Sequence, residues 1–181
     1  MRNRNRDDLG QLYDTLTKDI AHIVGGALSV PQFKRRSFVR AFIALVEFDT
    51  YNRKQRALYL HQQGHYRFEA SELMLLREIQ PELDDTGKVK ERQKYLRLID
   101  NYRFAIRMFC KATGIEFQLP TNDAGWTAFK DTVTVRNRIT HPKRMDEVNV
   151  SDKQLQTVIS AYKWFMDNYK AIVVLLKKLH C

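Results

Sequence analysis

Apolar side chains recur at spacings of three and four residues along most of this sequence, and this repeat constrains the fold more than any other feature. One regular stretch, Leu155 to Leu176, ends close to the last residue of the chain. Another runs from Phe33 to about Gln63 and has a wide apolar face, which is typical of a helix buried against more than one neighbour. No convincing strand, repeat or low-complexity tract accompanies these patterns. We therefore predict an all-α bundle.

Breaks in the repeat divide the chain into about six helices. Gly25-Gly26 and Pro31 end the first one, and the Gln80-Pro81 step ends the third. Residues 80–88 are then expected to form an exposed polar loop. Gly114 closes the next helix as a left-handed C-terminal residue. The predicted helices cover residues 9–30, 33–63, 68–79, 89–113, a segment from Trp126 to the 136–141 region, and 155–176.

Two short signals mark helix starts in the second half of the chain. Thr121 or Asn122 is expected to cap the helix that begins near Trp126. Ser151 and Gln154 have the spacing of a capping box, in which each side chain bonds the main chain of the other residue. The last helix is therefore expected to begin directly after Ser151.

Length and composition limit the class of protein. With 181 residues, 44% of them hydrophobic, the chain fits one compact domain over residues 1–181, with residues 1–8 frayed. No apolar run is long enough for a membrane span, and no signal peptide is recognisable, so we expect a soluble cytoplasmic protein. Cys110 and Cys181 offer neither a disulfide framework nor a zinc site. We expect no metal and no cofactor.

The chain is basic, and this favours an anionic partner. Its 31 lysines and arginines exceed its 21 acidic residues, which gives a formal charge of +10. Such an excess favours nucleic acid, with an anionic membrane surface or an acidic protein as alternatives. The basic run from Lys88 to Arg97 is expected to be a solvated face of the predicted helix over 89–113. Contact of this face with RNA stays open.

Chemistry-bearing side chains concentrate in the segment Val135–Lys143. It contains Arg136, Asn137 and His141 in the pattern R-N-x-x-x-H, and Pro142 follows directly. Residues five apart diverge by about 140° on a helix, so Arg136 and His141 would not converge on a continuous one. A residue before proline disfavours the helical conformation. We therefore predict that His141 leaves the helix and turns toward Arg136 or Asn137.

Arg136 needs an anionic or carbonyl partner in the predicted bundle. It follows Trp126, Phe129 and Val133 at helical spacing, and Thr140 continues the same row. This places its guanidinium toward the core side, where an unpaired charge is costly. Glu47 and Asp49, on the helix predicted over 33–63, are the candidate partners, although either could instead neutralise Arg53.

The side chains of this segment suit RNA cleavage without a metal ion. An arginine holds the scissile phosphate, and a histidine moves a proton to or from the 2′-hydroxyl or the leaving oxygen. In this interpretation His141 is the acid or base, Arg136 the phosphate clamp and Asn137 the orienting group. Arg138, Lys143 and Arg144 would add attraction for RNA phosphates.

The R-N-x-x-x-H motif on a helix end of an all-α protein resembles the signature of the HEPN superfamily. The resemblance covers only Val135–Lys143 and its helical context, and it carries over Arg136, Asn137 and His141. It implies a HEPN-like antiparallel helical bundle with metal-independent endoribonuclease activity. It also implies a homodimer with the motif at the interface, and a toxin or antiphage role with a possible antitoxin or defence-system partner protein.

A second interpretation makes the chain a non-catalytic module. Some HEPN domains bind RNA, nucleotides or proteins without cleaving RNA. Arg136 and His141 would then form a buried structural pair, and the basic faces would bind RNA or an acidic protein. The two interpretations differ in whether Arg136 and His141 reach solvent.

Overall fold

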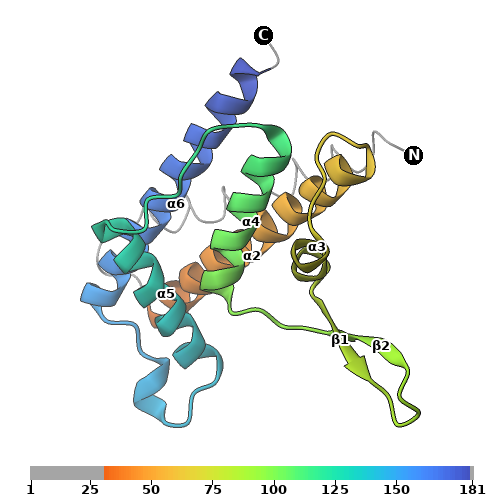
Figure 1. Ribbon diagram of the computed structural model, residues 1–181. Coiled ribbons are helices and arrows are strands. Elements are labelled where there is room, and N and C mark those ends of the chain that lie inside the picture. The colour runs from red at the N-terminus through yellow and green to blue at the C-terminus, as the bar shows by residue number, and fades with distance from the viewer. Residues whose placement is uncertain (1–30, 180–181) are drawn as a thin grey trace, which may run out of the picture. The chain divides into compact units, whose positions relative to one another are not determined.

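The computed structural model describes residues 31–179, and this part of the chain is mainly helical (Figure 1). The all-α class is therefore confirmed in its main feature. The helix predicted over residues 9–30 lies outside the described residues. The described elements are α2 (Gln32–Gln62), α3 (Ala70–Arg77), β1 (Ile79–Leu83), β2 (Val89–Gln93), α4 (Leu98–Thr113), α5 (Ala124–Thr140), the short 3₁₀ helix η1 (Met145–Val148) and α6 (Asp152–Lys178).

The chain divides into two compact units. Of the described residues, the first comprises 31–46 and Pro120–Tyr169. The second comprises Glu47–Leu119 and residues 170–179. Both α2 and α6 therefore contribute residues to each unit.

In the first unit, aromatic side chains join α2 and α5 to α6. The ring of Phe42 lies edge-on to Tyr162 and Phe165, with centroid distances of 5.7 and 5.8 Å. From α5, Phe129 stacks on Trp164 at 5.7 Å, and Trp126 contacts the same ring at 5.6 Å. Both tryptophans are buried, as their helical spacing predicts. Such aromatic contacts add specific geometry to the burial of apolar area.

Gly125 allows the close approach of α5 to α6. A Cβ atom at this position would overlap ring and Cβ atoms of Trp164. Alanine normally stabilises a helix relative to glycine. Here we expect Gly125→Ala to lower the free energy of unfolding by about 1–3 kcal/mol, because the Trp164 ring must shift. Urea denaturation measures the effect, with Lys130→Ala on an exposed face of α5 as control. An unchanged or raised stability would show that Trp164 does not pack here.

In the second unit, α2, α3 and α4 share one apolar cluster. Its buried members come from all three helices and from the segment before α3: Ala57, Leu60, Phe68, Leu76, Met108 and Ala112. Beside the cluster, Lys54 is 2% exposed and donates to Glu78 at 2.7 Å and to Asn101 at 3.1 Å. Burial lowers the pKa of Lys54, against the effect of Glu78. Glu78 therefore compensates a buried charge.

The Lys54–Glu78 pair gives the protein a pH-dependent contact. Desolvation alone would raise the pKa of Glu78, but hydrogen bonds from Lys54 and Asn101 outweigh it, so the pKa lies below its ordinary value of 4.5. The stabilisation is therefore present above pH 4.5 and is lost as the pH falls through the lowered pKa. We expect Glu78→Gln to cost roughly 1 kcal/mol near neutral pH and less in acid. Urea denaturation across this pH range tests it, and Glu91→Gln on exposed β2 is the control. A cost that does not vary with pH would contradict the assignment.

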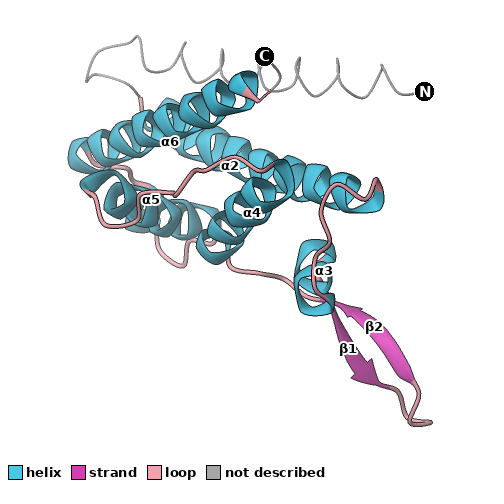
Figure 2. Ribbon diagram, turned by 45° about the horizontal axis from the view of Figure 1, so that its top comes forward, coloured by secondary structure: helices cyan, strands magenta, loops and turns pink. Residues whose placement is uncertain are grey.

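The expectation that no strand forms is wrong. Residues 79–93 form an antiparallel hairpin, in which Ile79 pairs with Gln93 and Leu83 with Val89. The helix predicted over 89–113 therefore begins only at Leu98. Figure 2 shows the hairpin extending away from α3 within the second unit. The lysines and arginines expected on a helix face at 88–97 lie on and around β2 instead.

The signals for helix ends are confirmed at two positions and corrected at one. Gly114 closes α4 with a φ of 76°, and the N–H of Gln154 donates to the hydroxyl of Ser151 at 3.2 Å, as the capping box requires. The N-cap of α5 is Asp123, one or two residues after the predicted Thr121 or Asn122. Its carboxylate accepts from the Trp126 N–H at 2.7 Å and from the Trp164 indole at 3.1 Å.

Candidate functional site

The candidate site lies at the C-terminal end of α5, within the first unit. The helix is fixed at its start by Asp123 and along its length by the buried side chains of Phe129, Val135 and Ile139. It ends at Thr140, as the proline after His141 predicts. His141 has a φ of −125° and a ψ of 56°, outside the helical region, and its N–H donates to the Asn137 carbonyl at 3.1 Å.

The three motif residues differ in burial and contacts. Arg136 is half-buried, whereas Asn137 and His141 are exposed. One guanidinium nitrogen of Arg136 donates to Oδ1 of Asn137 at 3.1 Å, which turns the amide nitrogen of Asn137 outward from that bond. The His141 imidazole makes no hydrogen bond or ion pair with the residues between 31 and 179. The structure thus joins Arg136 to Asn137 directly and joins His141 to them through the main chain.

The predicted row of core residues on α5 needs one correction. Trp126, Phe129 and Val133 are buried as expected, but Thr140 is exposed. The buried face instead continues through Val135 and Ile139, which lie one position before Arg136 and Thr140. Arg136 therefore sits at the border of the buried face, where its guanidinium reaches solvent in part.

Side chains of α2 and α5 hold the segment that follows the site. Arg138 donates to the carbonyls of Glu147 and, at 2.8 Å, Asn149. Arg36 donates to the carbonyl of Val148 at 3.3 Å. Arg35 and Gln32 donate to the carbonyl of Val150 at 2.9 and 3.1 Å. Four consecutive carbonyls thus accept hydrogen bonds from side chains, and these bonds hold the loop after His141 against α2 and α5. Below, residues 147–150 are called the pinned segment.

Arg40 is a functional candidate that the sequence interpretation missed. Its side chain is exposed on α2, and one guanidinium nitrogen donates to the Ile139 carbonyl at 3.0 Å. That carbonyl belongs to the last turn of α5, where carbonyls lack helical partners and favour a cation. Arg40 therefore brings a second guanidinium to the helix end that carries His141. The basic run Lys34–Arg36 with Arg40 was the available signal, but it resembles any solvated helix face.

The three cations predicted to attract RNA have different surroundings. Arg138 is half-buried, and its guanidinium donates to carbonyls of the pinned segment and, at 3.2 Å, to the side chain of Gln154. Arg144 is exposed and pairs with Asp146 at 3.0 Å. Lys143 is exposed, and its side chain forms no ion pair within the described part of the chain. Lys143 and Arg144 can reach a ligand from solvent, whereas Arg138 acts mainly as an anchor.

Glu147 orders the turn between these cations. Its carboxylate accepts from the Lys143 N–H at 2.6 Å, and this bond, together with nearby Arg144, lowers the pKa of Glu147. The turn that follows Pro142 therefore has a defined conformation at neutral pH.

We expect Arg138→Ala to loosen the pinned segment. The substitution removes hydrogen bonds to two carbonyls and to Gln154 and should lower the free energy of unfolding by about 1–3 kcal/mol. Amide hydrogen exchange of residues 147–150 should accelerate more than that of α5. Arg144→Ala removes an exposed pair with Asp146 and a longer contact of 3.7 Å with Glu147, and as the control it should change stability by less than about 1 kcal/mol. Equal effects of the two substitutions would contradict the anchoring role.

The two carboxylates predicted as partners of Arg136 belong to the second unit. Asp49 is buried and forms an ion pair with Arg53 at 2.7 Å, one turn along α2. This pairing was the alternative weighed for Asp49 in the sequence. Glu47 lies on an exposed face of α2, and its pairing with Arg136 stays a prediction.

Comparisons with known proteins add no identification. The chain matches no protein-family model, and no curated protein or solved structure is significantly similar to it. The HEPN resemblance therefore rests on the segment Val135–Lys143 and its helical context. Among the residues from 31 to 179, no cluster of histidine, cysteine and acidic side chains has the grouping of a metal site, and no helix is long and apolar enough to cross a membrane.

Proposed function

We propose that this chain is a metal-independent endoribonuclease of HEPN type, with its site at the C-terminal end of α5. The observation that carries the proposal is the position of His141. Its imidazole is exposed at a non-helical residue, directly after a helix end that also carries the bonded pair of Arg136 and Asn137. A proton-transfer group and a phosphate-binding group thus lie at the same helix end, where α5 fixes the backbone of Arg136 and Asn137.

The proposed reaction uses these side chains, the RNA itself and a second acid or base, which a second copy of the site supplies. The ribose 2′-oxygen loses its proton and attacks the adjacent phosphorus, and the bond to the 5′-oxygen breaks. His141 either accepts the proton of the 2′-hydroxyl or donates one to the leaving oxygen. Arg136 stabilises the charge that develops on the phosphate, and Asn137 donates from its amide nitrogen. The products are a 2′,3′-cyclic phosphate and a 5′-hydroxyl.

The basic surroundings of the site support RNA as the substrate. Arg40, Lys143 and Arg144 lie on the elements that adjoin the end of α5, and all three are exposed. Each can contribute phosphate attraction without reading the base sequence. Because one histidine cannot serve both oxygens at once, a second copy of the site would complete the chemistry. This agrees with the homodimer that the family resemblance implies.

An RNA cleavage assay tests the proposal. Purified protein is incubated with end-labelled RNA in the presence of EDTA, and an RNA duplex and a single strand are compared. We expect cleavage products from unpaired regions, because an exposed site at a helix end can reach a splayed nucleotide. Absence of cleavage by wild-type protein, with EDTA or with Mg²⁺ present, would refute the proposal.

A non-catalytic RNA- or protein-binding module is the second candidate. It is favoured by the half-buried state of Arg136, since a guanidinium at the border of the core also suits a structural role. In that case Arg136→Ala should lower the melting temperature and leave RNA affinity and toxicity unchanged. The nuclease proposal expects the substitution to abolish cleavage while Arg136→Lys, which keeps the charge but not the planar donors, restores only part of it.

A toxin or antiphage role belongs to the same proposal. It rests on the family resemblance and predicts growth arrest when the chain is expressed without a partner protein. Expression of the His141→Ala chain should relieve the arrest. An arrest that persists in this variant would separate toxicity from RNA cleavage.

A further inference from the structure

The two edges of the hairpin in the second unit differ. The N–H of Asp84 donates to the Lys88 carbonyl at 2.9 Å, and the N–H of Lys94 donates to the Glu78 carbonyl at 2.7 Å. These bonds fix the antiparallel ladder, in which hydrogen-bonded and non-bonded pairs alternate. In this register, even-numbered residues of β1 face even-numbered residues of β2, and these pairs are the ones joined by main-chain hydrogen bonds. The main-chain groups of odd-numbered residues therefore point outward from the hairpin.

The outer edge of β2 is open, and the outer edge of β1 is not. On β2, Val89, Glu91 and Gln93 direct their N–H and carbonyl groups outward, and no other strand of the described chain lies beside them. All five residues of β2 are exposed. On β1, the central outward position is Pro81, which has no N–H to donate. Only β2 offers an uninterrupted row of donors and acceptors for another strand.

The side chains of β2 define what could pair with this edge. Lys90 and Arg92 share one face of the hairpin, and Arg92 is bonded to Glu82 at 2.9 Å. Lys88, Lys90 and Lys94 form no ion pair with the described residues. This face therefore carries excess positive charge along the open edge.

The opposite face of the hairpin is apolar at one end. Leu83 and Val89 form a cross-strand pair there and are 66% and 71% exposed. Tyr95, just after β2, is 87% exposed. Apolar side chains next to an open strand edge are typical of surfaces that add a strand from a partner.

We propose that the outer edge of β2 binds an extended acidic segment of another protein by strand addition. The main chain of the segment pairs with Val89, Glu91 and Gln93. Its acidic side chains lie beside Lys90 and Arg92, and an apolar side chain covers Val89. This proposal does not depend on the ribonuclease proposal, because residues 78–95 belong to the second unit and the motif to the first.

Charge argues against a second copy of β2 as the occupant, and the main-chain groups of β2 argue against RNA. Antiparallel pairing of β2 with β2 of a second copy would bring Lys90 and Arg92 against like charges, which is unfavourable in cross-strand pairs. RNA would be attracted by the lysines, but it cannot form the ladder that the outward N–H and carbonyl groups of β2 offer. The exposed apolar side chains of Leu83 and Val89 also offer no favourable contact to the charged backbone of RNA.

The base of the hairpin is held by side-chain contacts, and this suits a strand edge that binds a partner. Glu78, directly before β1, has a left-handed φ of 55° and closes α3. Its carboxylate accepts from Lys54 and from Asn101, at 2.7 and 3.0 Å. A two-stranded hairpin alone is only marginally stable, so these contacts orient β1 and β2 before any partner arrives.

The first experiment measures binding of defined peptides to the full chain. The probe is a fluorescein-labelled peptide of about six residues with glutamate at alternate positions and valine or threonine between them. The control peptide has lysine in place of glutamate. We expect a rise in anisotropy with the acidic peptide only, and at least about tenfold weaker binding to Lys90→Glu. No binding of the acidic peptide, or equal binding of both peptides, would overturn the proposal.

The second experiment tests the strand pairing itself. Glu91→Pro removes the central outward N–H of β2, and Glu91→Ala keeps it, so only the first should weaken binding, by about three- to tenfold. Because proline could unfold the hairpin, two N-methylated peptides provide an independent test with wild-type protein. Methylation at one set of alternate residues should abolish binding, and methylation at the other set should not.

Amide hydrogen exchange locates the bound peptide. With peptide bound, the N–H groups of Val89, Glu91 and Gln93 should exchange more slowly, and those of Lys90 and Arg92 should change less. Two results would overturn strand addition: protection that avoids these three residues, or binding of a single-stranded RNA that depends on Lys88 and Lys90 while the acidic peptide does not bind.

Discussion

His141→Ala is expected to reduce the rate of RNA cleavage by about 10²–10⁴-fold, the usual contribution of a positioned acid or base. The imidazole lies on an exposed residue after the end of α5, so its removal takes away a proton-transfer group without disturbing the core. The melting temperature should therefore stay within a few degrees of the wild type. Single-turnover cleavage of labelled RNA gives the rate, and thermal unfolding gives the stability.

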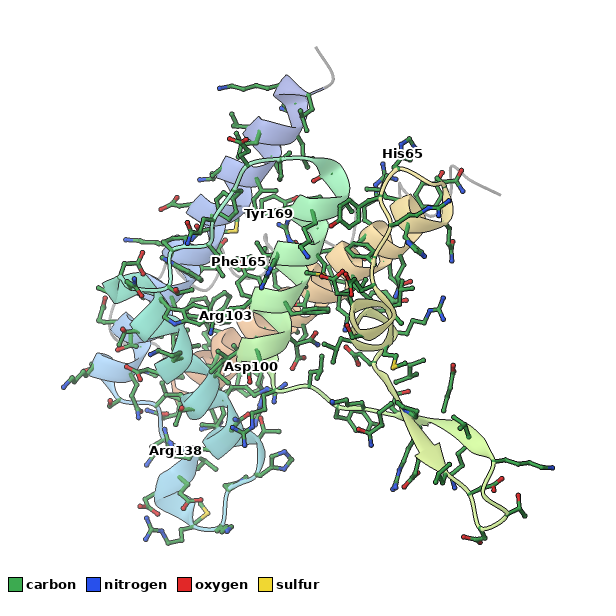
Figure 3. The ribbon with its side chains drawn as sticks, in the orientation of Figure 1. His65, Asp100, Arg103, Arg138, Phe165 and Tyr169 are labelled. Atoms are coloured by element: carbon green, nitrogen blue, oxygen red, sulfur yellow. The ribbon has the colours of Figure 1, made fainter. Side chains whose placement is uncertain are left out.

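His65→Ala is the matched control for this substitution. His65 is also exposed, on the loop after α2 in the second unit (Figure 3). We expect it to leave both the rate and the stability unchanged. If His141→Ala and His65→Ala cleave RNA equally fast, His141 is not the acid or base, even if the protein proves to be a ribonuclease.

Asp49→Ala is expected to lower the free energy of unfolding by about 3–5 kcal/mol, which is typical when one member of a buried ion pair is removed. The side chains of Asp49 and Arg53 are only 7% and 6% exposed, and they lie 2.7 Å apart. Arg53 also lies over the ring of Phe109, 5.1 Å from its centroid. The substitution thus takes the bonded carboxylate from a buried guanidinium inside the second unit. Urea denaturation measures the loss.

Asp146→Ala removes a carboxylate of the same type from an exposed pair. Asp146 and Arg144 are 68% and 71% exposed, so their pair should contribute less than about 1 kcal/mol. Similar losses for Asp49→Ala and Asp146→Ala would contradict a structural role for the buried pair. Arg53→Met combined with Asp49→Leu should recover much of the stability, because an apolar pair avoids the desolvation cost.

The long helices were predictable because their apolar faces decide their structure. The residues from 33 to about 63 and from 155 to 176 have an uninterrupted repeat, and α2 and α6 follow it closely. Gly114 and Ser151 marked helix ends for simple chemical reasons, a left-handed conformation and a reciprocal cap. The cap of α5 was less predictable. Asp123 replaces Thr121 and Asn122 because its carboxylate also meets the Trp164 indole, a contact between distant parts of the sequence.

The hairpin could not be predicted from periodicity. Its strands contain Pro81, Glu82 and Lys90, which are uncommon in strands, and its even-numbered positions are polar or charged on both strands. The available signal was local. Asp84 accepts from the N–H of Thr86 at 2.8 Å, and Gly87 adopts a φ of 77°, so the sequence from Asp84 to Gly87 encodes a turn. Because the apolar face of the strands is short, the pattern predicts a loop between helices at this turn.

The sequence predicted the helix end at the site, but it did not predict which side chains surround that end. Pro142 indicated where α5 stops, and His141 leaves the helix as expected. The anchoring role of Arg138 and the approach of Arg40 depend on backbone carbonyls, which a sequence pattern does not reveal. Figure 3 shows Arg138 where α5 ends, beside the loop that follows it. The hydrogen-bond acceptors of the nearby arginines, and not their charge, therefore distinguish an anchoring residue from one that can bind a ligand.

The most direct test of the central proposal uses one RNA in two forms. The wild-type protein is incubated in EDTA with a labelled RNA and with the same RNA carrying a single 2′-deoxynucleotide at the cleaved position. If the end of α5 cleaves RNA as proposed, the unmodified RNA is cut to a 2′,3′-cyclic phosphate, and the modified position is not cut at all. Cleavage at the 2′-deoxy position, or cleavage that requires Mg²⁺, would contradict the proposal.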